Sequence, residues 1–125
     1  MSAFRVVLVD DMVELRQLIK VTLERSGHFE VVGQAGNGRE GIDVAVATGP
    51  DLVLLDISMP VMDGLEALPQ LCRAVPATRV VMLSGFSEAR LGAEAAAGGA
   101  VAYLEKGLTP DALVARLLEV VQPPD

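Results

Sequence analysis

The chain has 125 residues and a formal net charge of −7, and 51% of its residues are hydrophobic. This length is enough for one domain with its own core, and the hydrophobic content argues against a disordered chain. The acidic balance disfavours binding to nucleic acid or to an anionic membrane, because such a surface repels polyanions. The apolar run near the start is too short for a signal peptide or a membrane span, so we expect a cytoplasmic protein.

Short runs rich in β-branched residues alternate with longer segments of helical periodicity along the whole chain. The predicted strands cover residues 5–9, 30–35, 51–56, 79–83 and 100–105, and the predicted helices cover 12–27, 38–48, 65–75, 87–97 and a segment from 110. The strands are apolar along their whole length, which is typical of a parallel sheet with helices on both faces. The sequence therefore predicts an α/β fold of five successive strand–helix units.

Local signals set some of the boundaries of these elements. Thr109 is a predicted N-cap, because Pro110 and an acidic residue follow it in the first turn of the last helix. Pro69 is tolerated in the helix near 65–75 only if that helix begins late. Residues 1–121 form one predicted domain, and the "QPPD" of residues 122–125 has the composition of a tail or linker.

Polar residues follow four of the predicted strands: Asp10, Asp11, Asp56, Ser84 and Lys106. Ligands of open parallel sheets bind at the carboxyl ends of the strands, so these side chains are candidates for one site. Clustered carboxylates repel one another at neutral pH and favour a hard divalent cation such as Mg²⁺. Asp56 could then act as a nucleophile toward a phosphoryl group, with Lys106 and Ser84 contacting the phosphoryl oxygens.

Four stretches carry a family resemblance: "VVLVDD", "DLVLLDISMPVMDG", "VVMLSG" and "AYLEKG". In this order at strand ends, they resemble the receiver domain of two-component response regulators over nearly the whole chain. The resemblance implies a flavodoxin-like, doubly wound five-stranded parallel sheet of strand order 2-1-3-4-5. It also implies that Asp56 is the phosphoacceptor and that Mg²⁺ or Mn²⁺ is held by Asp10, Asp11, Asp56 and the backbone carbonyl of Ser58.

The same resemblance implies a mechanism of phosphorelay signal transduction. Ser84 and Lys106 would engage the phosphoryl group, and Tyr103 would be an aromatic switch that turns inward when Ser84 moves. The partner would be a sensor histidine kinase, and the chain would catalyse only its own phosphorylation and dephosphorylation. The segment "EKGLTPDAL" resembles receivers joined to helix-turn-helix DNA-binding output domains, so we expect either an excised receiver that controls transcription or a stand-alone one.

The segment "GNGREG", residues 36–41, matches the dinucleotide-binding pattern G-x-G-x-x-G. A dinucleotide-binding protein carries this pattern after its first strand, whereas a complete strand–helix unit precedes it here. Receiver-like chains have "NG" before their second helix, so we expect Asn37 and Gly38 to supply turn conformations that these residue types adopt easily. We therefore expect no nucleotide cofactor.

Two other classes of protein remain as alternatives. A phosphohydrolase with an aspartyl nucleophile would carry a second aspartate two residues later, where this chain has Ser58. A flavin-binding protein would need a phosphate-accepting loop after the first strand, but "DDMVE" is acidic enough to repel phosphate without a metal. We also expect no cis peptide bond at Gly107, where many receivers have proline, and a looser loop there.

The last two helices are expected to carry the output of the domain. Leu91 is the only large apolar residue of the helix near 87–97, so this helix should be the least firmly docked. The last helix has a wide apolar arc whose edges could remain available to a partner. The face formed by residues 86–122 is therefore the predicted surface for a homodimer or an output domain. Of the remaining candidates, Asp63 is expected to shape a helix start, Cys72 to pack in a helix and His28 to lie on the surface.

Overall fold

The computed structural model describes residues 3–122 as five parallel strands that alternate with five helices. The elements in chain order are β1 (Phe4–Val9), α1 (Val13–Arg25), β2 (Phe29–Ala35), α2 (Gly38–Thr48), β3 (Leu52–Leu55), α3 (Gly64–Ala74), β4 (Arg79–Ser84), α4 (Glu88–Gly98), β5 (Ala102–Glu105) and α5 (Pro110–Val121). The strand order is β2-β1-β3-β4-β5, so the predicted fold and strand order are confirmed. Apart from Gln122, the predicted tail of residues 122–125 lies outside the described residues.

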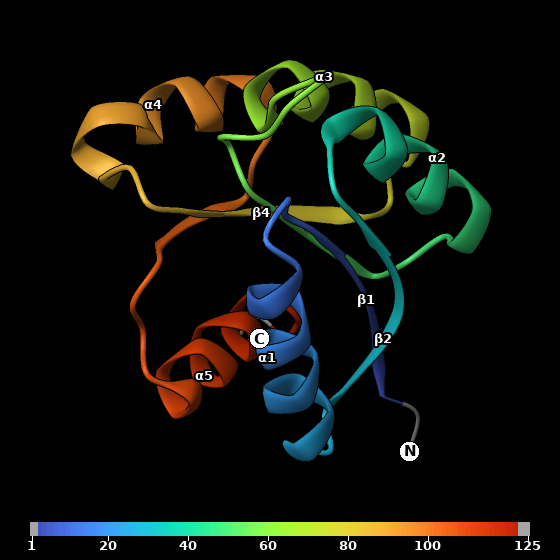
Figure 1. Cartoon of the computed structure of the whole chain (residues 1–125), viewed down its shortest axis with the longest axis vertical. Coiled ribbons are helices and arrows are strands. Elements are labelled where there is room, and N and C mark those ends of the chain that lie inside the picture. Colours follow the sequence, from blue (N-terminus) through green and yellow to red (C-terminus); the bar gives the residue numbers. More distant parts are fainter. Residues whose placement is uncertain (1–2, 123–125) are drawn as a thin grey trace.

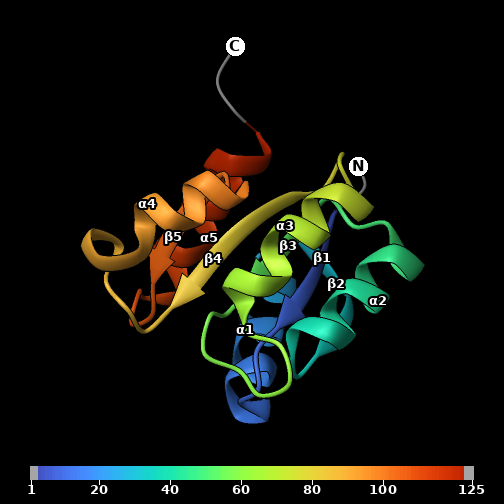
Figure 2. The same ribbon diagram turned by 90° about the horizontal axis from the view of Figure 1, so that it is seen from above.

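The sheet separates two layers of helices, with α2, α3 and α4 on one face and α1 and α5 on the other (Figure 1). Figure 2 shows the same arrangement from above, with β5 at one edge of the sheet and β2 toward the other. All four residues of the central strand β3 are buried, because they face helices on both sides. The uniformly apolar strands thus reflect a sheet covered on both faces, as the sequence predicted.

The starts of two helices confirm predictions from the sequence. The Thr109 side chain accepts a hydrogen bond from the backbone N–H of Ala112 at the start of α5. Asp63 is the N-cap of α3 and forms a capping box with Glu66. The Asp63 side chain accepts from the Glu66 backbone N–H, and the Glu66 side chain accepts from the Asp63 backbone N–H. These caps satisfy amide groups that would otherwise lack partners in the first turn.

The explanation that the sequence suggested for Asn37 and Gly38 is wrong. Asn37 has an extended backbone with φ −155° and is the N-cap of α2, its side chain accepting from the Glu40 N–H. Gly38 is absent from the described residues with positive φ. A β-carbon at Gly38 would instead lie 2.7 Å from the Met62 carbonyl oxygen and 2.9 Å from the Ala67 β-carbon. Gly38 is therefore required by close packing of α2 against the segment before α3.

The expectation that α3 begins late because of Pro69 is also wrong. The helix starts at Gly64 and continues to Ala74, so Pro69 lies inside it. Proline cannot donate the hydrogen bond that this position would make to the carbonyl of Leu65, at a cost of about 3 kcal/mol in a regular helix. The capping box and the fully buried Leu68 and Leu71 hold the helix together despite this loss.

Helix α4 contacts the rest of the domain with little apolar surface. Ala95 is its one fully buried residue within the described chain, and Leu91 is half-buried. This sparse burial agrees with the predicted weak docking of α4. Gly107 has φ +107°, and residues 3–122 contain no cis peptide bond, as predicted for this loop.

The remaining placements follow the sequence. His28 is exposed, and Cys72 is half-buried on α3 with its sulfur 3.7 Å from the Gly99 carbonyl oxygen. Within residues 3–122, none of the helices combines the length and the hydropathy that a membrane crossing requires.

Candidate functional site

The carboxyl ends of four strands bring the predicted site residues together. Asp10 and Asp11 follow β1, Asp56 follows β3, Ser84 ends β4, and Lys106 follows β5. Asp10, Asp56 and Ser84 are buried, with 5%, 4% and 0% of their surface exposed, whereas Asp11 is exposed. The site thus has a buried floor and an open rim.

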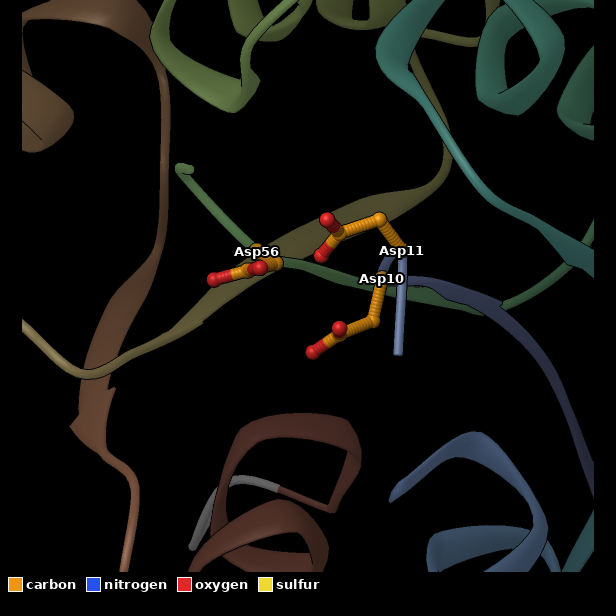
Figure 3. A group of neighbouring side chains, drawn as sticks. All are labelled: Asp10, Asp11 and Asp56. Carbon is orange, nitrogen blue, oxygen red and sulfur yellow. The ribbon is translucent and has the colours of Figure 1, made fainter. Parts of the chain in front are cut away.

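Three carboxylates form the acidic part of the site. One oxygen of each of Asp10, Asp11 and Asp56 lies within 4.8 Å of the other two. Figure 3 shows Asp10 and Asp11 leaving the end of β1 on opposite sides, with Asp56 beside them. Asp11, Asp56 and Ser58 also line one open pocket of about 390 Å³. Several carboxylates at such spacing form the all-oxygen donor set that Mg²⁺ prefers, so these residues fit a divalent cation.

Lys106 forms ion pairs with two of these carboxylates and offsets their negative charge. Its ammonium nitrogen lies 3.0 Å from Asp10 Oδ2 and 3.3 Å from Asp56 Oδ1. Burial by itself lowers the pKa of Lys106, but its hydrogen bond to Asp10 and the charges of Asp56 and Asp10 outweigh burial and raise the pKa. Lys106 is therefore a permanent cation at neutral pH. Its backbone N–H also donates a hydrogen bond to the Ser84 carbonyl at 2.8 Å.

Asp56 has the opposite electrostatic balance. Burial and the nearby charge of Asp10 raise its pKa, and these effects exceed the lowering by Lys106 and by the hydrogen bond from the Ile57 N–H. A carboxylate that is costly to ionise gains most from a cation beside it. The site is thus arranged so that an added positive charge stabilises the ionised form of Asp56.

Gly64 packs closely against the backbone of Asp56, a role that the sequence reasoning missed. Its N–H donates to the Ile57 carbonyl at 2.8 Å. A β-carbon at Gly64 would overlap with the carbonyl oxygen of Asp56 and would lie 2.9 Å from the α-carbon of Ile57. The first residue of α3 therefore has to be glycine for the helix to approach the end of β3 this closely. The only signal in the sequence was the "MDG" stretch that holds it.

A chain of hydrogen bonds connects Ser84 to Tyr103 through Phe86, a residue that the sequence reasoning also missed. The Phe86 N–H donates to Ser84 Oγ at 3.1 Å, and the Tyr103 hydroxyl donates to the Phe86 carbonyl at 2.8 Å. Tyr103 is 6% exposed, so its ring is already buried while Ser84 is bonded to Phe86, which differs from the expectation that Tyr103 turns inward when Ser84 moves. Farther along, the Glu105 carboxylate accepts from the Glu88 N–H at the start of α4 at 3.0 Å. Strand β5 is thereby connected to the β4–α4 loop through Tyr103 and to the start of α4 through Glu105.

The fold and the site together identify a phosphoryl-accepting signalling switch built on a doubly wound sheet. The chain belongs to the response regulator receiver domain family, whose model matches residues 6–118. A receiver domain is a signalling domain and not an enzyme in the usual sense. The predicted family and the predicted class of function are thus confirmed.

Some relatives match this chain over nearly their whole length, and others match it over only part of their length. It is 32% identical to the chemotaxis protein CheY of Thermotoga maritima, over 93% of this chain and 96% of that protein. It is 41% identical to a protein-glutamate methylesterase/protein-glutamine glutaminase of Geobacter sulfurreducens, over 86% of this chain but only 30% of that protein. The signal receiver domain of NarL from Mycobacterium tuberculosis has a TM-score of 0.91 and 31% identity, covering 99% of this chain and 100% of that domain.

Proposed function

We propose that the chain accepts a phosphoryl group on Asp56 in a reaction that requires Mg²⁺ or Mn²⁺. The metal ligands would be Asp10, Asp11, Asp56 and the backbone carbonyl of Ser58. The observation that carries this proposal is the convergence of three carboxylates within 4.8 Å of one another beside the ammonium group of Lys106. When bound, the divalent ion supplies positive charge that offsets the carboxylates and the phosphoryl oxygens.

The proposed donor is a phosphohistidine of a sensor histidine kinase. An oxygen of Asp56 attacks phosphorus, the new O–P bond forms, and the N–P bond breaks with its electron pair going to the departing imidazole. Lys106 and Ser84 then hold the phosphoryl oxygens through an ammonium group and a hydroxyl group. Both lie with Asp56 along the same pocket, so they can reach a group attached to it.

The proposed signal is a change in the β4–α4 loop. A phosphoryl group adds a charge of about −1.5 to −2, and Ser84 would leave its present hydrogen bond with the Phe86 N–H to contact it. The Phe86 carbonyl accepts from Tyr103, so a shift of this loop affects the inward position of Tyr103 and the start of α4. Helix α4 has little buried apolar surface to oppose the shift.

We propose that the surface formed by residues 86–122 carries this change to a homodimer partner or an output domain. Transcription regulation is the proposed output, and the chain itself makes no direct contact with nucleic acid. The likeness to the transcriptional regulatory protein LiaR of Bacillus subtilis, which is 36% identical over 82% of this chain and 48% of that protein, supports this choice. The proposed location is the cytoplasm, where a kinase would meet the domain.

Mapping of the modified residue tests the assignment of Asp56. The chain is incubated with a small phosphodonor and Mg²⁺, treated with borohydride to convert an aspartyl phosphate to homoserine, and digested for peptide mass spectrometry. We expect conversion at residue 56 only. Conversion at Asp10, Asp11 or Asp63 with Asp56 unmodified would contradict the proposal.

Hydrogen exchange tests the proposed output surface. The amide exchange of the chain is compared with and without beryllofluoride and Mg²⁺, and the Asp56→Asn variant serves as the control. We expect altered exchange in residues 86–122 of the wild type and none in the variant. A change limited to the loops that hold Asp10, Asp56 and Ser84 would refute this part of the proposal.

A further inference from the structure

The loop that carries two of the proposed metal ligands lacks a side-chain cap at the start of the following helix. Asp10 and Asp11 lie between β1 and α1, and the N-cap residue Met12 is extended, with no hydrogen bond from its side chain. The Asp10 N–H donates to the Ala35 carbonyl at 3.0 Å, and Asp10 Oδ1 accepts from the Met12 N–H at 2.9 Å. These contacts leave the carbonyl of Asp10, directly before Asp11, to be held by another group.

Arg16 provides that contact from the first turns of α1. Its Nη1 donates to the carbonyl oxygen of Asp10, and its Nε donates to Oε1 of Gln34 on β2 at 3.1 Å. The guanidinium is planar and its donors are fixed relative to one another, so the two acceptors are held at a defined separation. Arg16 is half-buried, which shields both hydrogen bonds partly from water. One side chain thus connects α1, the ligand loop and the second strand.

We propose that Arg16 is a positioning residue for the metal site: by fixing the Asp10 carbonyl to β2 through Gln34, it sets the positions from which Asp10 and Asp11 bind the cation. This inference rests on the proposed function, because it needs these two carboxylates to be metal ligands. Groups that orient a metal ligand through hydrogen bonds typically change metal affinity by about 10- to 100-fold when they are removed.

The sign of the effect separates positioning from simple charge. Arg16 is a cation near an acidic site, so its charge alone opposes the binding of a second cation. If charge were its main influence, Arg16→Met would bind Mg²⁺ more tightly than the wild type. If positioning dominates, the same variant binds Mg²⁺ more weakly, despite the loss of a repelling charge.

The test is calorimetric titration of the purified chain with Mg²⁺ alone, without any phosphodonor. We expect Arg16→Met to weaken Mg²⁺ binding about tenfold. Arg16→Lys keeps the charge but cannot hold both acceptors, so it should restore binding only in part. Gln34→Met removes the anchor on β2 and leaves Arg16 in place, so it should weaken binding in the same direction by a smaller factor. If Arg16→Met does not fold, the other two variants still decide the question.

Two further variants make the outcomes distinguishable. Arg25→Met makes the same charge change in the last turn of α1. Within the described part of the chain, the Arg25 side chain forms no hydrogen bond or ion pair. The affinity of this variant for Mg²⁺ should therefore match that of the wild type. Asp11→Asn should lose most binding. Unchanged or tighter Mg²⁺ binding by Arg16→Met, with Asp11→Asn impaired, overturns the role of Arg16 alone. Unimpaired binding by Asp11→Asn overturns both this inference and the proposed metal site.

Discussion

The ammonium nitrogen of Lys106 lies 3.0 Å from Oδ2 of Asp10, which joins the end of β5 to the end of β1 across the carboxyl edge of the sheet. Between them, Asp56 contacts the same ammonium group at 3.3 Å. Among residues 3–122, Lys106 is thus the ion-pair partner of both buried carboxylates. Removal of the Lys106 ammonium group should show how much free energy the burial of Asp10 and Asp56 costs.

We expect Lys106→Met to lower the free energy of unfolding at pH 7 by about 2 kcal/mol, measured by urea unfolding. Breaking a fully buried ion pair costs about 3–5 kcal/mol, and Lys106 is 25% exposed, which reduces the effect. Added Mg²⁺ should restore part of the loss, because it replaces the missing positive charge. A variant as stable as the wild type at pH 7 without Mg²⁺ would show that Lys106 does not compensate these acids.

The same ion pairs predict how stability depends on alkaline pH. The pKa of Lys106 is raised in the folded state, so its contribution is fully present below the ordinary lysine pKa of about 10.4 and is lost as pH rises through the folded pKa. The wild type should therefore lose stability relative to Lys106→Met in this alkaline window. Parallel stability curves for the two proteins above pH 10 would contradict this expectation.

Asp56→Asn should be more stable than the wild type at pH 7 in the absence of metal. The raised pKa of Asp56 means that the folded chain binds more protons than the unfolded chain, so stability falls as pH rises from about 4, the ordinary carboxyl value, through the folded pKa. The variant lacks this loss, and its advantage should disappear below about pH 4. Exposed Asp43 is the control, since Asp43→Asn should change stability by less than about 0.5 kcal/mol. An Asn variant that is less stable at pH 7 would contradict the electrostatic account.

Gly64→Ala should damage both the fold and the site, because the new methyl group would overlap with the Asp56 carbonyl. We expect a loss of about 3 kcal/mol in urea unfolding, as for other forced overpacking. Gly85→Ala is the matched control, since Gly85 lies next to Ser84 and a β-carbon there meets no atom within 4 Å. Similar stability of the two variants would mean that α3 can move away from β3 without cost.

Glu105→Ala should loosen the start of α4, because it removes the acceptor for the Glu88 N–H. A hydrogen bond of this kind contributes about 1 kcal/mol, so the amide of Glu88 should exchange roughly fivefold faster. Glu105→Gln keeps an acceptor oxygen and should exchange at nearly the wild-type rate. Equal exchange in all three proteins would indicate that Ser87 alone holds the first turn of α4.

The sequence predicted the strand–helix order well, because buried parallel strands and amphipathic helices differ clearly in their apolar period. The predicted boundaries differ from those of the structure by two residues or fewer, and for the last helix only the start was predicted. The buried acids and Lys106 were also predictable, since the carboxyl ends of parallel strands must meet at one edge. These inferences need only the topology and not the details of packing.

The residues that were missed or misread depend on contacts between distant segments. Gly38 and Gly64 are required by the close approach of another backbone, whereas local turn preference suggested only a positive φ for the first of them. Pro69 is tolerated because buried neighbours on α3 outweigh its local cost. Arg16 was missed because its partners lie on a loop and on β2, and no pattern along the chain reveals this pairing.

The proposed function depends on Asp56 accepting one phosphoryl group with the help of a divalent cation. The intact mass of the chain is measured after incubation with a small phosphodonor, with Mg²⁺ and with a chelator, for the wild type and for Asp56→Asn. We expect the mass increase of a single phosphoryl group for the wild type with Mg²⁺, and no increase with the chelator or in the variant. Full labelling of the folded Asp56→Asn variant, or equal labelling of the wild type without a divalent cation, would contradict it.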